Sequence, residues 1–201
     1  MRADALHSWT RAVYNVSQHR LASAFAECLR RPADWPIGGQ DVSSLIWMVL
    51  NAAIAVTEAD SGNVQIVDNY GGLHIVAHRG FDRAFLDHFD TVHDGVAACG
   101  TAMQAGHRII VSDVMQSSAF SASDRAIMRD ASARAVQSTP VVSAAGSVIA
   151  MVSTHFQVPH KPSEKQLRLL DALVLHAGAV FTRAAHECRS DPGVPALLLA
   201  R

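Results

Sequence analysis

Two adjacent segments, "RAVQSTPVVS" and "SVIAMVSTHF", constrain the fold of this chain more than any other feature. They are of strand length, largely apolar along their course, and joined through "AAG", which is typical of an antiparallel hairpin. Strands that are apolar on both faces need a cover on each side of the sheet. The chain is therefore expected to fold as a sheet with helices packed on both faces.

The rest of the chain supplies those helices and a second hairpin. The runs "NVQIVD" and "LHIVAHRG" flank the turn-rich "NYGG" and predict two more antiparallel strands, and "HRIIVSDV" predicts another. Helical patterns occur in residues 4–30, "VSSLIWMVLNAAIAV", "FDRAFLDHF", "CGTAMQAG", "SASDRAIMRDASA" and the segment from Pro162 onward. The predicted class is α+β: an antiparallel sheet with the first and last helices on one face and the short middle helices on the other.

The expected domain organisation follows from the breaks in these patterns. An N-terminal amphipathic helix and the linker "RRPADWPIGGQ" occupy residues 1–40, one domain occupies 41–187, and a tail occupies 188–201. Ser121 or Ser123 is the expected cap of the "SASDRAIMRDASA" helix. Ser163 and Gln166 form the expected capping box of the last helix.

Composition excludes several classes of function. The net charge is -1 and no block of Lys and Arg occurs, so nucleic-acid binding is not expected. The longest apolar stretch, "LIWMVLNAAIAV", is about half of the roughly 20 residues that a membrane-spanning helix needs. The cysteines, Cys28, Cys99 and Cys188, form no CxxC motif, which fits a reducing compartment. We expect a cytoplasmic protein without a membrane segment.

The N-terminal helix predicts a homodimer. Its apolar stripe comprises Leu6, Trp9, Val13, Val16, Leu21 and Phe25. A free stripe of that size marks an interaction surface. Pairing residues 4–30 and the last helix, 163–185, about a twofold axis would give a four-helix bundle. The alternative is that the N-terminal helix folds back onto its own sheet.

Four stretches together carry a resemblance to a known family. They are "SGNVQIVDNYGGLHIVAHRGF", "ACGTAMQAGHRIIVSDV", "RAVQSTPVVSAAGSVIAMVSTHF" and "PSEKQLRLLDAL". Over roughly residues 41 to 185 the chain resembles a bacterial GAF domain of the sort often joined to sensor histidine kinases. The resemblance implies a GAF/PAS-like fold, a small-molecule cavity between the sheet and the middle helices, and a histidine kinase or other signalling protein as partner. It leaves the cofactor unknown, because different members bind cyclic nucleotides, bilins, haem, small anions or amino acids.

Cys99 is the residue that separates an enzyme from a binding module. GAF domains that carry a bilin usually have a histidine at or next to the position after the cysteine, whereas here Gly100, Thr101 and Ala102 follow. Methionine sulfoxide reduction needs a second, resolving thiol, and the predicted core holds one cysteine. Cys99 is therefore read as a small apolar residue at the start of a helix, with a reactive thiol as the alternative.

Polar residues inside the long strands mark the candidate ligand site. Alternation groups Gln137 with Thr139, and Ser153 with His155. Buried polar groups need partners, so these side chains face either a ligand or an internal hydrogen-bond network. The predicted ligand-binding residues are Gln137, Thr139, Ser153, His155 and Cys99, with no catalytic residue and no metal ligand. His74 and His78, four apart in one strand, should share a face, and a metal or haem would need them to converge with ligands from a second strand or helix.

Three functions remain open at this stage. The first is a non-catalytic sensor that binds a small molecule between the sheet and the middle helices and signals through its terminal helices. The second is a thiol-based redox enzyme or redox sensor centred on Cys99. The third is a dimerisation module without a ligand. The missing resolving cysteine favours the first and the third, so the protein is not expected to be an enzyme.

Overall fold

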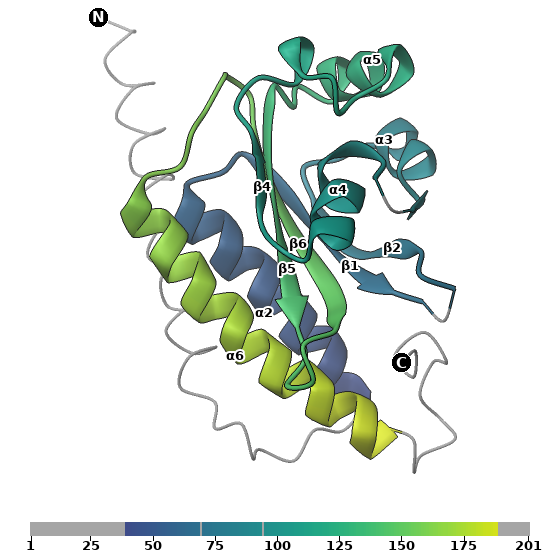
Figure 1. The fold of residues 1–201 in the computed structure, drawn as a ribbon, viewed down its shortest axis with the longest axis vertical. Helices are drawn as coiled ribbons and strands as arrows, with labels where there is room; N and C mark the ends of the chain where they lie inside the picture. The colour runs from purple at the N-terminus through teal and green to yellow at the C-terminus, as the bar shows by residue number, and fades with distance from the viewer. Residues whose placement is uncertain (1–38, 69, 94, 189–201) are drawn as a thin grey trace, which may run out of the picture.

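One antiparallel sheet of six strands is the centre of the computed structural model, which describes residues 39–68, 70–93 and 95–188 (Figure 1). The strands are β1 (Ser61–Val67), β2 (Leu73–Arg79), β3 (Thr91–Val92), β4 (Ile109–Val111), β5 (Ala135–Val142) and β6 (Val148–Phe156). The helices are α2 (Gly39–Thr57), α3 (Arg83–His88), α4 (Ala97–Ala105), the 3-10 turn η1 (Val114–Gln116), α5 (Ala122–Asp130) and α6 (Glu164–Cys188). The α+β class expected from the sequence is confirmed.

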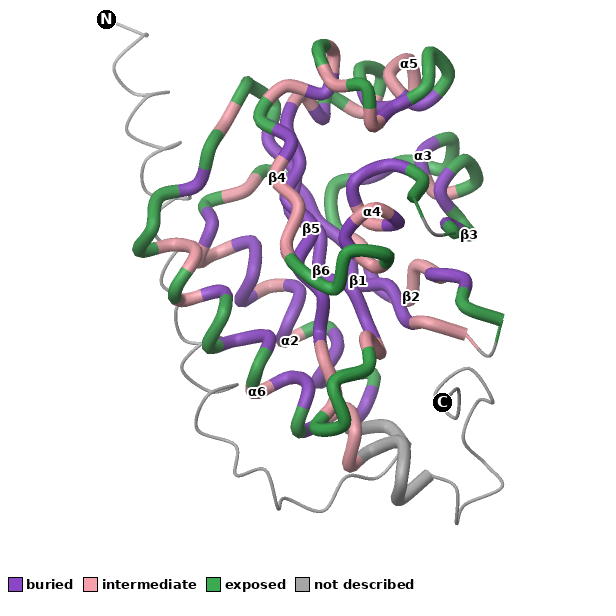
Figure 2. Tube along the Cα trace, viewed as in Figure 1, coloured by how far each residue is buried: buried purple, intermediate pink, exposed green. Residues whose placement is uncertain are grey.

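Both predicted hairpins are present and form most of the sheet. The strand order is β3-β2-β1-β6-β5-β4, so β1 and β6 bring the two hairpins together at the centre. The β5–β6 pair runs in register from Ala135 opposite Phe156 to Val141 opposite Ala150. As the sequence predicted, these central strands are buried on both faces (Figure 2).

Helices α2 and α6 lie side by side and cover one face of the sheet, here called the helix face (Figure 1). The core between them and the strands is formed by branched aliphatic residues, among them Leu50, Val64, Val152, Leu170 and Leu173. Two long helices fit this face because each presents an apolar stripe at helical spacing. The opposite face is covered by α3, α4 and α5, which pack on a second core rich in phenylalanine.

Caps fix the ends of two helices. Of the two candidate caps for α5, Ser121 is the one used: its hydroxyl accepts the Asp124 N–H at 3.1 Å, and the Asp124 carboxylate accepts the Ser121 N–H at 2.8 Å. At α6 the Ser163 hydroxyl accepts the Gln166 N–H at 3.3 Å, and the Gln166 side chain accepts the Ser163 N–H at 2.8 Å. These reciprocal bonds satisfy orphan donors at each helix start.

Helix α2 begins at Gly39 and α6 ends at Cys188. The division of the chain into residues 1–40, 41–187 and 188–201 stays a prediction. The predicted N-terminal helix, 4–30, and the tail after Cys188 lie outside the described residues. None of the helices in the described ranges has the length and apolarity needed to cross a bilayer.

Candidate functional site

The register of the three central strands places polar side chains in one row on the face opposite α2 and α6. Asn63 of β1 lies opposite Ser153 of β6, which lies opposite Ser138 of β5. Directly opposed residues of antiparallel strands point to the same face. The hydroxyls of Ser138 and Ser153 are 2.8 Å apart and hydrogen-bonded. Gln65 follows Asn63 by two residues in β1, and His155 follows Ser153 by two residues in β6. Both side chains therefore project from the same face of the sheet.

Apolar side chains from the short helices close over this polar row. Phe85 of α3 and Phe89 directly after it have ring centroids 4.8 Å apart. The ring of Phe85 also stacks on Phe81, with centroids 3.8 Å apart and planes 5° from parallel. Phe120 and Met128 approach from the α5 side. The site is therefore polar on its floor and aromatic on its roof.

Two roof helices, α3 and α5, are tied together by a buried carboxylate. His88 of α3 and Asp124 of α5 share a hydrogen bond of 2.7 Å. Burial raises the pKa of Asp124, but hydrogen bonds with His88 and Ser121 outweigh it and hold the pKa below its usual value. Asp124 is thus charged at neutral pH and links the α5 cap to α3.

Helix α4 reaches the sheet because its first turn consists of small residues. A Cβ on Gly100 would lie 2.2 Å from the backbone oxygen of His93, so only glycine allows this approach. The neighbouring Ala97, Ala98 and Cys99 line the space between α4 and the strands. The run "AACG" is therefore explained by close packing of a helix on a preceding loop.

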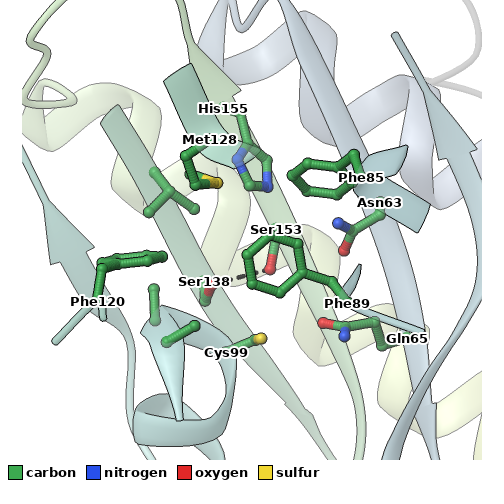
Figure 3. Close-up of a pocket in the computed structure, with 13 residues that line it drawn as sticks. Asn63, Gln65, Phe85, Phe89, Cys99, Phe120, Met128, Ser138, Ser153 and His155 are labelled. Atoms are coloured by element: carbon green, nitrogen blue, oxygen red, sulfur yellow. Dashed lines mark hydrogen bonds between the residues drawn. The ribbon is translucent and has the colours of Figure 1, made fainter. Parts of the chain in front are cut away.

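We call the enclosed space the sheet pocket. It is lined by Asn63, Gln65, Phe85, Phe89, Ala97, Ala98, Cys99, Phe120, Met128, Val136, Ser138, Ser153 and His155. The volume open to the centre of a water molecule is about 20 Å³, which is room for a single water. Figure 3 shows that Asn63, Gln65, Ser153 and His155 point toward this common space.

His155 is the most unusual group in the sheet pocket. Its residue is 4 % exposed, and neither ring nitrogen has a hydrogen-bond partner among the described residues. The rings of Phe81 and Phe85 meet it edge-on, with centroids at 4.9 and 5.8 Å. Burial lowers the pKa of His155 to about 3. The imidazole is neutral at physiological pH, so one nitrogen donates and the other accepts.

Two side-chain amides of β1 add to this unpaired polarity. The Oδ1 of Asn63 and the Oε1 of Gln65 are buried and have no hydrogen-bond partner among the described residues. Leaving such atoms unpaired costs about 1 to 3 kcal/mol each. Asn63, Gln65 and His155 therefore bring unpaired polar atoms together in one small space.

Cys99 lines the sheet pocket from the first turn of α4, as a half-buried residue without a disulfide. Burial raises the pKa of its thiol to about 11, although hydrogen bonds with the Gly100 backbone and the Gln65 side chain act in the opposite direction. The thiol is therefore protonated near neutral pH and a poor nucleophile. Cys28 and the side chain of Cys188 lie outside the described part of the chain.

The predicted set of site residues is divided between the two faces of the sheet. Ser153, His155 and Cys99 line the sheet pocket, whereas Gln137 and Thr139 do not. Gln137 lies opposite Thr154, and Thr139 lies opposite Val152, so both point to the helix face. Grouping Gln137 and Thr139 with Ser153 and His155 was wrong, because alternation within a strand does not say how two strands are aligned.

Gln137 and Thr139 instead belong to a polar network that reaches α6. The Gln137 amide donates to the Thr139 hydroxyl at 3.3 Å. The Nε of Arg108 donates to the same hydroxyl at 2.9 Å, and its Nη2 donates to Asp171 of α6. For Gln137 and Thr139, an internal hydrogen-bond network is therefore present, which is the predicted alternative to a ligand contact.

Sequence reasoning missed Asn63, Gln65 and Ser138. Asn63 and Gln65 alternate with Val64 and Ile66 in "GNVQIVD", so their shared face was readable from the sequence. Alternation places Ser138 on the other face of its strand from Gln137 and Thr139, so predicting those two as site residues excluded Ser138. The pairing of Ser138 with Ser153 reverses that assignment.

The histidines of β2 do not share a face. A bulge shifts the β1–β2 register between Val64, opposite Ala77, and Gln65, opposite Ile75. His78 therefore lies on the pocket face with Asn63, and His74 lies on the helix face with Ile66. In the described ranges no three His, Cys, Asp or Glu side chains converge in a way that could hold a metal ion.

Known proteins with the same fold cover most of this chain. A domain of a sensor histidine kinase protein from Sinorhizobium meliloti has 18 % identity and a TM-score of 0.63, over 78 % of this chain and 99 % of its own. The GAF domain of a phosphoenolpyruvate-protein phosphotransferase from Coxiella burnetii has 12 % identity and a TM-score of 0.66, over 86 % and 98 %. A free methionine-R-sulfoxide reductase from Neisseria meningitidis has 17 % identity and a TM-score of 0.56, over 81 % and 89 %.

A comparison with protein families agrees with the structural one. No curated protein matches the sequence. The family model described as "GAF domain" matches residues 39–182, which span the described sheet and nearly all of α6. The chain therefore belongs to the GAF domain family, a family of sensory and signalling domains.

Proposed function

We propose that this protein is a non-catalytic sensor that binds a small molecule in the sheet pocket and passes the binding event to a partner through its terminal helices. The observation that carries the proposal is His155, buried in the pocket with both ring nitrogens unpaired. A fold that had no use for a ligand would lower its free energy by replacing this group with an apolar one. A small molecule that pairs with it recovers that free energy on binding.

The route from the sheet pocket to α6 runs through Arg108. Helix α4, which lines the pocket, ends at Ala105, and Arg108 follows three residues later, directly before β4. The side chain of Arg108 crosses to Thr139 and to Asp171 of α6. A ligand that displaces α4 would therefore disturb the ion pair between Arg108 and Asp171 of α6. It shifts the equilibrium between two arrangements of the helices by the difference in its affinity for them.

The outward side of α2 and α6 is the proposed interface. Trp47 of α2 and Leu175 of α6 are large apolar residues that are 44 % and 76 % exposed. Together with the apolar stripe of residues 4–30, they favour a homodimer built from the N-terminal helix and residues 163–185. The output partner is a histidine kinase or another signalling protein, which is supported by the similar fold of a domain from a sensor histidine kinase protein.

Redox chemistry at Cys99 has less support. The Neisseria meningitidis reductase shares the fold, but at 17 % identity the likeness extends to the fold alone. The raised pKa of Cys99 leaves the thiol protonated, and the described side chains include no second cysteine that could regenerate it after oxidation.

The proposal is tested by native mass spectrometry of the full chain as purified. The expected result is a mass excess of one small molecule per chain that disappears when the protein is denatured. Ser153→Leu, which fills the sheet pocket, should abolish the excess. Thr154→Val is the matched control, because Thr154 is buried next to Ser153 but points to the helix face.

Two outcomes would contradict the sensor proposal. One is equal mass excess in wild type and Ser153→Leu, which would move the ligand away from the sheet pocket. The other is no excess, together with no rise in Tm from any member of a metabolite library, which would favour the ligand-free dimerisation module.

A further inference from the structure

We infer that the sheet pocket selects an uncharged, planar ligand with both hydrogen-bond donors and acceptors, of the class of aromatic amides and nitrogen heterocycles. This inference rests on the proposed function and adds the ligand class to it. It depends on three properties of the pocket: the absence of charge in its lining, the kinds of polar atoms left unpaired, and the shape of its aromatic roof.

Charge is the first property. None of the described residues that line the sheet pocket carries a formal charge, since the lining consists of amides, hydroxyls, one thiol, one imidazole and apolar groups. Asp124, a carboxylate of the roof helix α5, is already paired with His88 and with the Ser121 N–H. A buried ion without a counter-charge is strongly disfavoured. Anionic and cationic ligands would both lose their hydration without compensation.

His155 does not change this conclusion. An imidazole could supply a positive charge to an anion, but burial among Phe81, Phe85 and the strands lowers the pKa of His155 to about 3. The group therefore meets a ligand as one neutral donor and one neutral acceptor.

The unpaired atoms define the polar half of the ligand. Asn63 Oδ1 and Gln65 Oε1 can only accept hydrogen bonds, and His155 adds one acceptor and one donor. The ligand must therefore bring N–H or O–H groups and at least one acceptor. A primary amide or a ring with adjacent N–H and C=O or N atoms carries this combination in one plane.

The aromatic roof of the sheet pocket defines the apolar half of the ligand. Phe85 and Phe89 lie over the polar row, with Phe120 and Met128 at the side (Figure 3). Aromatic rings and a methionine sulfur pack well on the faces and edges of a planar ring. Since the space open to the centre of a water molecule is about 20 Å³, a ligand of one or two rings enters only once the roof side chains move apart.

Three molecules of one shape test the inference: benzamide, which is neutral, benzoate, which is an anion, and benzamidinium, which is a cation at neutral pH. Each is titrated into the full-length protein, and binding is followed by calorimetry and by the NMR signal of the Met128 methyl group. We expect benzamide to shift this signal and to bind at least tenfold more tightly than either charged analogue.

Variants locate the effect. His155→Leu removes both ring nitrogens at similar volume and should weaken benzamide binding at least tenfold; Asn63→Leu serves the same purpose if His155→Leu does not fold. Gln137→Leu is the matched control, because Gln137 also has a buried, unpaired amide oxygen but faces α2 and α6. Its affinity for benzamide should equal that of wild type.

Each remaining outcome overturns the ligand class. Benzoate or benzamidinium binding as tightly as benzamide would show that the pocket accepts charge, while the sensor proposal would stand. No response to any of the three would also reject the class, and the native mass measurement then decides separately whether the pocket holds a ligand at all. Benzamide binding that is unchanged in both His155→Leu and Asn63→Leu would place its site elsewhere.

Discussion

His155 lowers the stability of the folded protein, because its buried ring nitrogens have no hydrogen-bond partner among the described residues. Residues of this strand that face the core are mainly apolar or, like Ser153, paired. His155 is neither, although it is as buried as they are. A buried imidazole also makes stability depend on pH, because it is neutral in the folded chain and free to bind a proton in the unfolded one.

The sign of this dependence gives a prediction. The pKa of His155 is about 3 in the folded protein and 6.5 when unperturbed, so between these values the unfolded state binds more protons. Its contribution to stability is complete above 6.5 and is lost as the pH falls toward 3. At about pH 5 wild type should have lost about 2 kcal/mol more than His155→Leu, relative to neutral pH. Urea titrations of both proteins across this range measure the difference; parallel curves would contradict it.

The Cys99 thiol gives a second prediction at the scale of one residue. Because burial raises its pKa to about 11, few molecules carry the thiolate near neutral pH. Iodoacetamide should therefore modify Cys99 on the order of a hundredfold more slowly in the folded protein than in urea. Peptide mass spectrometry at timed intervals reports the rate for Cys99 alone. Rapid modification of the folded chain would revive the redox alternative.

At the scale of elements, the packing of α6 on the sheet depends on a glycine. A Cβ on Gly178 would lie 2.2 Å from the backbone oxygen of Val142, at the end of β5. Gly178 therefore lets the helix touch the strand backbone directly, in the middle of an element that otherwise favours alanine. Helical propensity alone would predict the opposite preference.

Gly178→Ala should consequently destabilise the protein by about 2 to 3 kcal/mol, because α6 has to move away from β5. Thermal or urea unfolding measures the change. Ala179→Gly is a suitable comparison, since Ala179 is exposed on the same helix. This variant should lose only about 1 kcal/mol of stability, because glycine has a lower helical propensity than alanine. A stabilised Gly178→Ala protein would show that the close approach is not required.

At the scale of the whole molecule, the sheet separates two polar systems. The network of Gln137, Thr139, Arg108 and Asp171 lies toward α6, and the unpaired groups of the sheet pocket lie toward α3, α4 and α5. The first is joined by hydrogen bonds between its own side chains, with only the Gln137 Oε1 unpaired among them, and it holds elements together. The second has buried polar atoms without partners, and it is the site of the proposed ligand.

The proposed dimer predicts that a charge on the outward side of α6 weakens self-association. Leu175→Glu in the full chain should raise the dimer Kd at least tenfold, equivalent to about 1.4 kcal/mol, because a carboxylate would have to be buried in the bundle. Light scattering across a concentration series measures the Kd. Val158→Glu, at a site 64 % exposed in the segment between β6 and α6, should leave the Kd unchanged. Equal behaviour of both variants, or a monomeric wild type, would remove α6 from the interface.

Sequence by itself determined the elements and the class of the fold. Hydrophobic period is a local property, so both hairpins, the short middle helices and the final helix were readable from runs of residues. Capping is equally local, which is why Ser163 and Gln166 were placed correctly. The alternation in "GNVQIVD" also predicts that Asn63 and Gln65 share a face, although only the structure places that face in the sheet pocket.

Tertiary structure alone decided which residues meet in the site. Alternation says which side chains of one strand share a face, but the face itself is set by how neighbouring strands align, and a shift of one residue reverses it. This is why Gln137 belongs with α6 and Ser138 with the sheet pocket, and why the bulge opposite Val64 and Gln65 separates His74 from His78. The unpaired state of His155 is likewise a property of its surroundings, since only the fold packs the rings of Phe81 and Phe85 against it and leaves both nitrogens without a partner among the described residues.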